Sequence, residues 1–353
     1  MLTHHQYNLL NNSGKVWANL EVFSRARDPR YLPDFLSGDP ITGSVHLKLD
    51  RPDSVRSVKI SVIGQIGSFT VDNATAFEFL NVSQTIWTAS ADPPIGKGNN
   101  TGKVQDLVGE HTWPFCISLP KDINLQVDAV SHTFTLPPSF FETGAKISIQ
   151  YELVCTIARG RLRIDSRRVR YSLGTLIGYT PIIRPPPPSA LRQKSYRDNK
   201  PLVGLRDCLG WLSLAPLFIT HGGGIGHANC TLSIAKPLLY TRGTVIPLLL
   251  NIESSADELV ELLASPKEIV ANLVRYIRHH PDTQTTDVNR VGTTKVFQEI
   301  IGTAVWWLQQ DEMQCRRTLQ GEIRLSRDLK PSFSFAHLNL RVCHHRCTST
   351  GVR

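Results

Sequence analysis

The stretch Ile147-Ser-Ile-Gln-Tyr-Glu-Leu-Val-Cys-Thr-Ile157 decides the fold of this chain. Its apolar residues stand at every second position, with Ser148, Gln150 and Glu152 between them. Successive side chains of a β-strand point to opposite faces, so this pattern predicts a strand with one buried face and one wet face.

Shorter runs with the same period flank this stretch. In the first half they cover Val45–Leu49, Val58–Val62 and Trp113–Leu119, and in the second half Thr231–Ile234 and Ile246–Ile252. Glycine and proline clusters separate the runs, as they do between the short strands of a β-sandwich. We therefore predict an all-β fold.

Length and composition describe an ordinary globular protein with more than one domain. The chain has 353 residues, of which 41% are hydrophobic and 20% charged, and this length suggests two domains. No stretch reaches the roughly 18 apolar residues of a membrane span, and residues 1–10 have no apolar signal core. We therefore expect a cytoplasmic protein.

The seven cysteines are scattered and odd in number, which favours reduced thiols over a disulfide framework. Cys343 and Cys347 flank two histidines. One such cluster without a second pair does not predict a metal site. We expect no metal, cofactor or catalytic residue.

The charge of the chain is concentrated in one segment. The net charge is +9, and residues 157–206 hold twelve Lys/Arg and two acidic residues, so this segment carries +10 and the remainder −1. A localised charge of this kind indicates a local anionic partner.

Six arginines in this segment form the candidate site for a phosphate or an acidic partner. Arginines two residues apart on a strand share a face, about 7 Å from one another, and repel unless an anion lies between them. The planar guanidinium also binds phosphate bidentately. The alternative is a solvated face that keeps the sheet soluble. The candidates are Arg159, Arg161, Arg163, Arg167, Arg168 and Arg170.

The Pro-rich basic segment 182–208 is predicted to be a hinge between two domains. Pro185, Pro186, Pro187 and Pro188 favour an extended polyproline helix and cannot continue a sheet. This run could be a ligand for proline-binding domains, but its position already explains it as a spacer.

Several blocks, in order, resemble the arrestin family, and the later ones resemble its fungal arrestin-like members. The similarity covers roughly residues 15–335. The blocks are Gly43–Leu49, Val58–Gly64, His111–Pro120, Leu136–Phe140, Ile149–Leu153, Gly178–Pro181, Leu232–Pro237, Tyr240–Gly243, Ile246–Leu248, Gly321–Leu325 and Leu329–Phe333.

The resemblance implies two tandem immunoglobulin-like antiparallel β-sandwich domains, at 15–181 and 209–342, and no active site. It implies an adaptor that binds the cytoplasmic tails of membrane transporters or receptors and supports their trafficking, endocytosis or ubiquitination. Basic residues on the N-terminal domain would meet phosphorylated tails, phosphoinositides or inositol phosphates. A HECT-type ubiquitin ligase would be a further partner, and the protein would be peripheral at membranes.

The chain departs from the family pattern in two places. It has no Pro-Pro-x-Tyr motif for a ligase, because Pro188 is followed by Ser189 and Ala190. After Phe335 the expected apolar strand is replaced by Arg341-Val-Cys-His-His-Arg346, so the second sandwich is expected to lack its last strand.

Three alternatives remain. The basic segment could bind nucleic acid, which requires exposed aromatic rings near Arg159, or acidic lipid. His221–Gly224 resembles the oxyanion loop of esterases, but the chain has no G-x-S-x-G elbow to supply a nucleophile.

Two further segments are open to prediction. Ser255 and Glu258 indicate a capping box that opens a short helix, and residues 295–313 fit a helix about as well as a strand.

Overall fold

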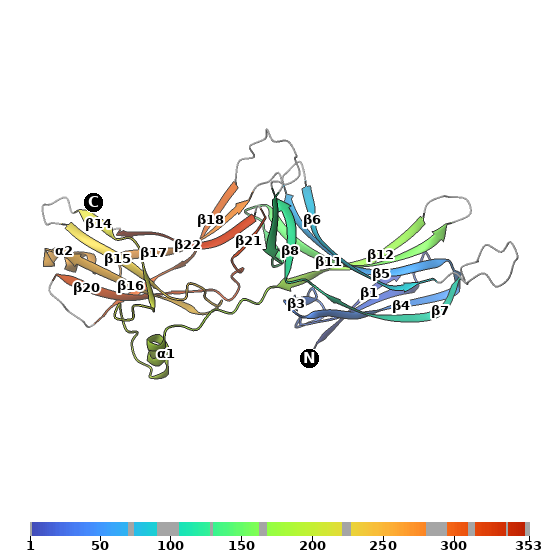
Figure 1. Ribbon diagram of the computed structural model, residues 1–353, viewed down its shortest axis with the longest axis horizontal. Coiled ribbons are helices and arrows are strands. Elements are labelled where there is room, and N and C mark those ends of the chain that lie inside the picture. Colours follow the sequence, from blue (N-terminus) through green and yellow to red (C-terminus); the bar gives the residue numbers. More distant parts are fainter. Residues whose placement is uncertain are drawn as a thin grey trace, which may run out of the picture. The chain divides into compact units, whose positions relative to one another are not determined.

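The computed structural model (Figure 1) describes residues 2–69, 74–89, 106–127, 130–161, 168–220, 227–279, 295–309, 315–336 and 338–349. The described residues are mostly β-strands, with helices α1 (Ala190–Arg197) and α2 (Asp257–Leu263). The all-β prediction is confirmed. None of these helices has the length and apolarity needed to span a bilayer.

The chain divides into two compact units. The first contains residues 1–182, 279–295 and 333–338, and the second contains residues 183–278, 296–332 and 339–353. The first unit therefore takes in a short segment from near the end of the chain.

Two sheets build the first unit as a sandwich. One has the strand order β1-β2-β4-β7, and the other has the order β3-β12-β11-β5-β6 with β10 paired to β11. β8 and β9 form a separate hairpin. The strands are β1 (Thr3–Leu10), β2 (Val16–Ser24), β3 (Asp34–Leu36), β4 (Pro40–Asp53), β5 (Val55–Phe69), β6 (Ala74–Thr88), β7 (Leu107–Ser118), β8 (Asp122–Val127), β9 (Val130–Thr135), β10 (Phe140–Glu142), β11 (Ile147–Arg161) and β12 (Arg168–Thr180).

The alternate apolar residues that predicted β11 are the ones that pack into the core. Every second residue from Ile147 to Ile157 is buried, and the residues between them are exposed or half-buried apart from Ser148. Tyr151 is fully buried, and its hydroxyl donates to the carbonyl oxygen of Pro137 at 2.6 Å. Burial raises the pKa of this phenol.

Phenylalanines from 333–338 contribute to the core of the first unit. Phe335 is fully buried, with its ring 4.9 Å from the ring of Phe79 and 5.6 Å from that of Phe134. The ring of Phe333 lies 5.5 Å from that of Phe140. Phe333 and Phe335 thus pack against rings from β6, β9 and β10, which are distant from them in sequence.

The second half contains two more sheets, of order β13-β15-β16-β20-β19, with β14 paired to β15, and β18-β17-β22-β21. Their strands are β13 (Trp211–Ser213), β14 (Leu217–Thr220), β15 (His227–Ala235), β16 (Val245–Ser254), β17 (Ile269–His279), β18 (Lys295–Thr303), β19 (Val305–Leu308), β20 (Arg316–Arg324), β21 (Phe333–Phe335) and β22 (Leu338–Ser349).

The structure decides three local points in this half. Residues 295–313 fitted a helix about as well as a strand, and the structure forms strands at Lys295–Thr303 and Val305–Leu308. Helix α2 begins after Ala256, with no side-chain cap at its first turn, so the capping box predicted at Ser255 is wrong. The sequence suggested that the last strand of the second sandwich is missing. The structure has a strand there, β22, which lies between β17 and β21.

Candidate anion-binding hairpin

Strands β11 and β12 bring the two halves of the basic segment together. They are consecutive and antiparallel (Figure 1), and the register places Arg161 opposite Arg168 and Ala158 opposite Arg170. The candidate arginines from both strands therefore converge at one end of the sheet. We call residues 159–170 the basic hairpin. Arg163 and Arg167 lie outside the described residues, and only the backbone is described at Arg161 and Arg168.

Arg159 occupies a different environment from the one its sequence pattern predicted. It continues the parity of Cys155 and Ile157, both fully buried, so its side chain follows the core face of β11. Its Nη2 lies 2.7 Å from Oδ2 of Asp53, and both side chains are about a quarter exposed, at 25% and 22%. The charge of Arg159 is thus already paired within the unit.

Two aromatic rings enclose the same guanidinium. The Arg159 Cζ atom lies 4.7 Å from the ring centre of Trp17 and 4.4 Å from that of Tyr171, within the range of cation–π attraction. Arg159 also donates from Nη1 to the Tyr171 hydroxyl at 3.2 Å. Arg159 therefore ties β2, β4, β11 and β12 together at the base of the hairpin.

A second arginine, which sequence reasoning missed, lies beside this base. Arg56 on β5 is 3.6 Å from Asp106, measured from Nη2 to Oδ1. Its guanidinium lies against Gly160, where a Cβ atom would come within 3.0 Å of Arg56 Nε. Glycine at position 160 thus leaves room for Arg56. Charge counting along 157–206 could not find this residue, because it comes from another strand.

Among the candidate arginines whose side chains the structure describes, Arg170 is the one without an ion-pair partner. It is exposed, and it makes no ion pair with any residue that the structure describes. At the base of the hairpin, two buried guanidinium nitrogens have no hydrogen-bond acceptor among the described residues, Nη1 of Arg56 and Nε of Arg159. The base of the hairpin therefore has more donors than acceptors.

The other sequence candidates lie elsewhere. Pro185–Pro187 are exposed, and Pro188 is half-buried before α1. His221–Gly224 falls outside the described residues. No group of three His, Cys, Asp or Glu in the described part of the chain is placed to hold a metal ion.

The aromatic rings near the hairpin do not offer the stacking platform that the nucleic-acid alternative requires. Trp17, beside Arg159, is 8% exposed, and Tyr171 is half-buried against it. Phe115 and Tyr151 also face the core. These rings serve packing, and among the described side chains of this region Arg170 is an exposed cation.

Residues 23–173 match the family model of the arrestin (or S-antigen) N-terminal domain. This stretch, rather than the chain as a whole, is what the match assigns to the arrestin family. The match runs from the end of β2 into β12, so it includes the basic hairpin together with Asp53 and Tyr171 at its base, whereas Trp17 precedes it. No curated protein matches the chain.

Proposed function

We propose that this chain is a non-enzymatic arrestin-like adaptor whose basic hairpin binds phosphorylated or otherwise acidic segments of membrane-protein tails. The observation that carries the proposal is the β11–β12 register, which gathers arginines from two strands at one end of an arrestin N-terminal domain. The match to that domain supports a binding role rather than a catalytic one.

The arrangement suggests two roles for the arginines, one structural and one in binding the anion. Arg159 is paired with Asp53 and enclosed by Trp17 and Tyr171, so it holds the hairpin base. Arg161, Arg163, Arg167, Arg168 and Arg170 would then contact the anion. Guanidinium groups held close together repel one another, and a phosphate between them relieves that repulsion through charge-assisted hydrogen bonds.

The proposed partners follow from this chemistry and from the arrestin resemblance. They are cytoplasmic tails of transporters or receptors, with inositol phosphates or phosphoinositides as smaller ligands of the same site. A HECT-type ubiquitin ligase would be the second partner of an adaptor in traffic. Because the chain has no Pro-Pro-x-Tyr motif, such a ligase would have to be recruited by another contact. The protein would act in the cytoplasm, at the membrane periphery.

The test is a titration of the full chain with inositol hexakisphosphate and, separately, with a phosphopeptide and its unphosphorylated form. We expect Arg161→Glu/Arg163→Glu/Arg168→Glu to weaken binding of both phosphate ligands by at least about tenfold, since each lost phosphate contact removes a charge-assisted bond. Arg159 is left intact because its loss would disturb the fold.

A matched charge-reversal variant controls for net charge. Lys121, Lys267 and Arg324 are exposed cations outside the hairpin, so their triple change to Glu lowers the net charge equally. We expect this control to bind like the unaltered chain. If the hairpin variant binds the phosphate ligands as tightly as the unaltered chain, the hairpin is not the site. The same follows if the hairpin variant and the control variant lose equal affinity.

A further inference from the structure

A second surface, away from the basic hairpin, is built around helix α1. Ser189 caps the helix by accepting from the Arg192 amide at 3.2 Å, and its hydroxyl donates to the buried carboxylate of Asp207. Arg192 Nη1 donates to the carbonyl oxygen of Lys236 at 2.7 Å. The Lys236 amide donates to the carbonyl oxygen of Gly210 at 2.7 Å.

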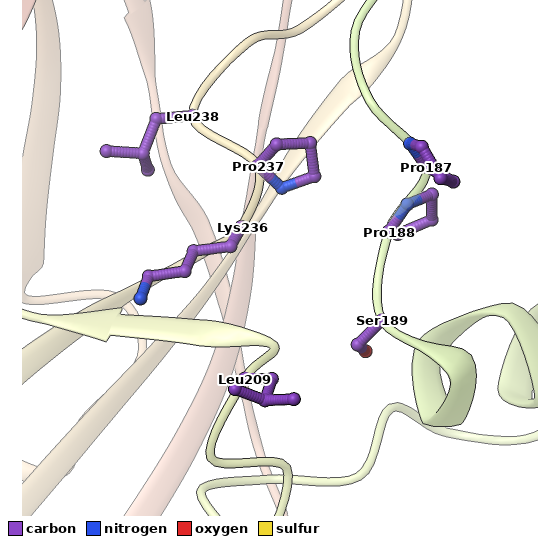
Figure 2. Close-up of a pocket in the computed structure, with 7 residues that line it drawn as sticks. All are labelled: Pro187, Pro188, Ser189, Leu209, Lys236, Pro237 and Leu238. Atoms are coloured by element: carbon purple, nitrogen blue, oxygen red, sulfur yellow. The ribbon is translucent and has the colours of Figure 1, made fainter.

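These bonds join three segments of the second unit: α1 with the prolines before it, the turn before β13, and the turn after β15. Figure 2 shows their side chains around a shallow depression of about 420 Å³. The lining is mainly apolar in residue type. It consists of Pro187, Pro188, Ser189, Leu209, Lys236, Pro237 and Leu238. We call this surface the α1 face.

Leucines protrude from the α1 face. Leu209 is 82% exposed, Leu238 is 56% exposed and Leu239 is 41% exposed. Leu209 comes from one turn, and Leu238 and Leu239 come from the other. A single exposed leucine is common on protein surfaces, but several on adjoining turns form a patch that favours an apolar contact.

Unpaired cations accompany these leucines. Residues 183–210 contain six Lys/Arg and two Asp, and of the two acids Asp207 is buried and bonded to Ser189. Lys194, Arg197, Lys200, Arg206 and Lys236 are exposed and make no ion pair with the described residues. The α1 face therefore combines positive charge with protruding aliphatic side chains.

We propose that the α1 face docks on a membrane containing anionic lipids. Positive charge draws the face to such a bilayer, and the leucines enter the boundary between headgroups and acyl chains. The carboxylates of an acidic peptide would satisfy the cations, but they would leave the protruding leucines exposed to water. A bilayer accepts separate protrusions because it needs no matching shape. This proposal does not depend on anion binding by the basic hairpin.

The test is flotation of the full chain with vesicles. One vesicle is phosphatidylcholine alone, and the other contains about a third phosphatidylserine, which gives the surface a negative potential. We expect binding to the anionic vesicle and little to the neutral one. Raising the salt to about 0.5 M should weaken the binding, because the screening length becomes shorter than the charge separations.

Two variants and one control assign the contact. Leu209→Ser/Leu238→Ser and Lys194→Gln/Lys200→Gln/Lys236→Gln should each weaken vesicle binding by about tenfold or more. Leu217→Ser/Phe218→Ser removes side chains that are 46% and 79% exposed in the same unit, and this control should bind unchanged. Circular dichroism confirms that each variant is folded.

The outcomes separate this surface from the basic hairpin and from soluble anions. The Arg161→Glu/Arg163→Glu/Arg168→Glu variant should keep its vesicle binding, and free glycerophosphoserine should not displace the vesicles. The proposal is overturned if the anionic vesicle is not bound, if the leucine variant binds like the unaltered chain, or if the control loses as much. Binding of an acidic peptide without vesicle binding would likewise overturn it.

Discussion

At the scale of single residues, Arg159 shows how one side chain can belong to the core and to a charged segment together. Its guanidinium contacts a carboxylate and two aromatic rings, so it acts through packing as well as charge. Sequence alone placed it with Arg161 and Arg163 on a wet face. The partner at Asp53 comes from β4, which a reading of local periodicity cannot show.

The Arg159–Asp53 pair is open to a double-mutant cycle. We expect Arg159→Met and Asp53→Asn each to lower the free energy of unfolding by about 2 kcal/mol, between the values for exposed and buried ion pairs. The double variant should lose less than the sum, because the two side chains contact each other. Urea unfolding measures all four proteins, and strictly additive losses would contradict the pairing.

The buried thiol of Cys155 gives a second test at this scale. Burial raises its pKa from 9.0 to about 12, so the thiolate that reacts with labelling reagents is absent at neutral pH. Cys116 and Cys208 are exposed and should react in the native protein, whereas Cys155 should react only after unfolding. Mass spectrometry of labelled peptides distinguishes the sites, and rapid native labelling of Cys155 would refute its burial.

The same pKa shift has a defined sign for stability. The folded state holds the Cys155 proton more tightly than the unfolded state does. The stability that this shift contributes is therefore fully present below pH 9.0 and declines as the pH rises towards 12.

At the scale of elements, the strands with strict alternation were predictable and the ambiguous ones were not. β11 follows directly from its period of two. β18 and β19 carry exposed apolar residues such as Val296 and Ile300 on edge strands, so their apolar spacing matched a helix. Helix α1 follows four prolines and is polar, and it was not expected because its ties to Asp207 and Lys236 are tertiary.

Gly43 shows how closely β2 and β4 approach within their sheet. A Cβ atom at this position would lie 1.9 Å from the carbonyl oxygen of Glu21 and 2.7 Å from the ring of Phe115. The backbone cannot yield as a flexible side chain would, so we expect Gly43→Ala to cost about 3 kcal/mol of stability.

Thermal unfolding followed by circular dichroism checks this. Gly14→Ala is a useful comparison, since no atom lies within 4 Å of a Cβ there and its cost comes from the positive φ of 76° alone. A loss at Gly43 no larger than the loss at Gly14 would count against the close approach of β2 and β4.

At the scale of the whole molecule, the first unit is completed from the far end of the chain. Sequence analysis placed the first domain at 15–181 and could not assign Phe333 and Phe335 to it, because no periodicity links residues so far apart. In the structure Phe335 is fully buried among Phe79 and Phe134. The arrestin N-terminal domain therefore draws part of its core from residues outside the matched range.

We expect Phe335→Ala to lower the free energy of unfolding by about 3–5 kcal/mol, through lost burial and the cavity that remains. A chain ending at residue 182 lacks this ring and should expose its phenylalanine partners to a hydrophobic dye. Leu176→Ala, at a position that is 41% exposed, should cost far less. Calorimetry that found no difference between the two variants would refute the assignment of Phe335 to this core.

The most direct measurement of the central claim is hydrogen–deuterium exchange of the full chain with and without a phosphopeptide. We expect slower exchange in peptides covering residues 157–171, no such change with the unphosphorylated peptide, and none in the Arg161→Glu/Arg163→Glu/Arg168→Glu variant. If the phosphopeptide binds and the hairpin exchanges at an unchanged rate while another region is protected, the basic hairpin is not the anion site.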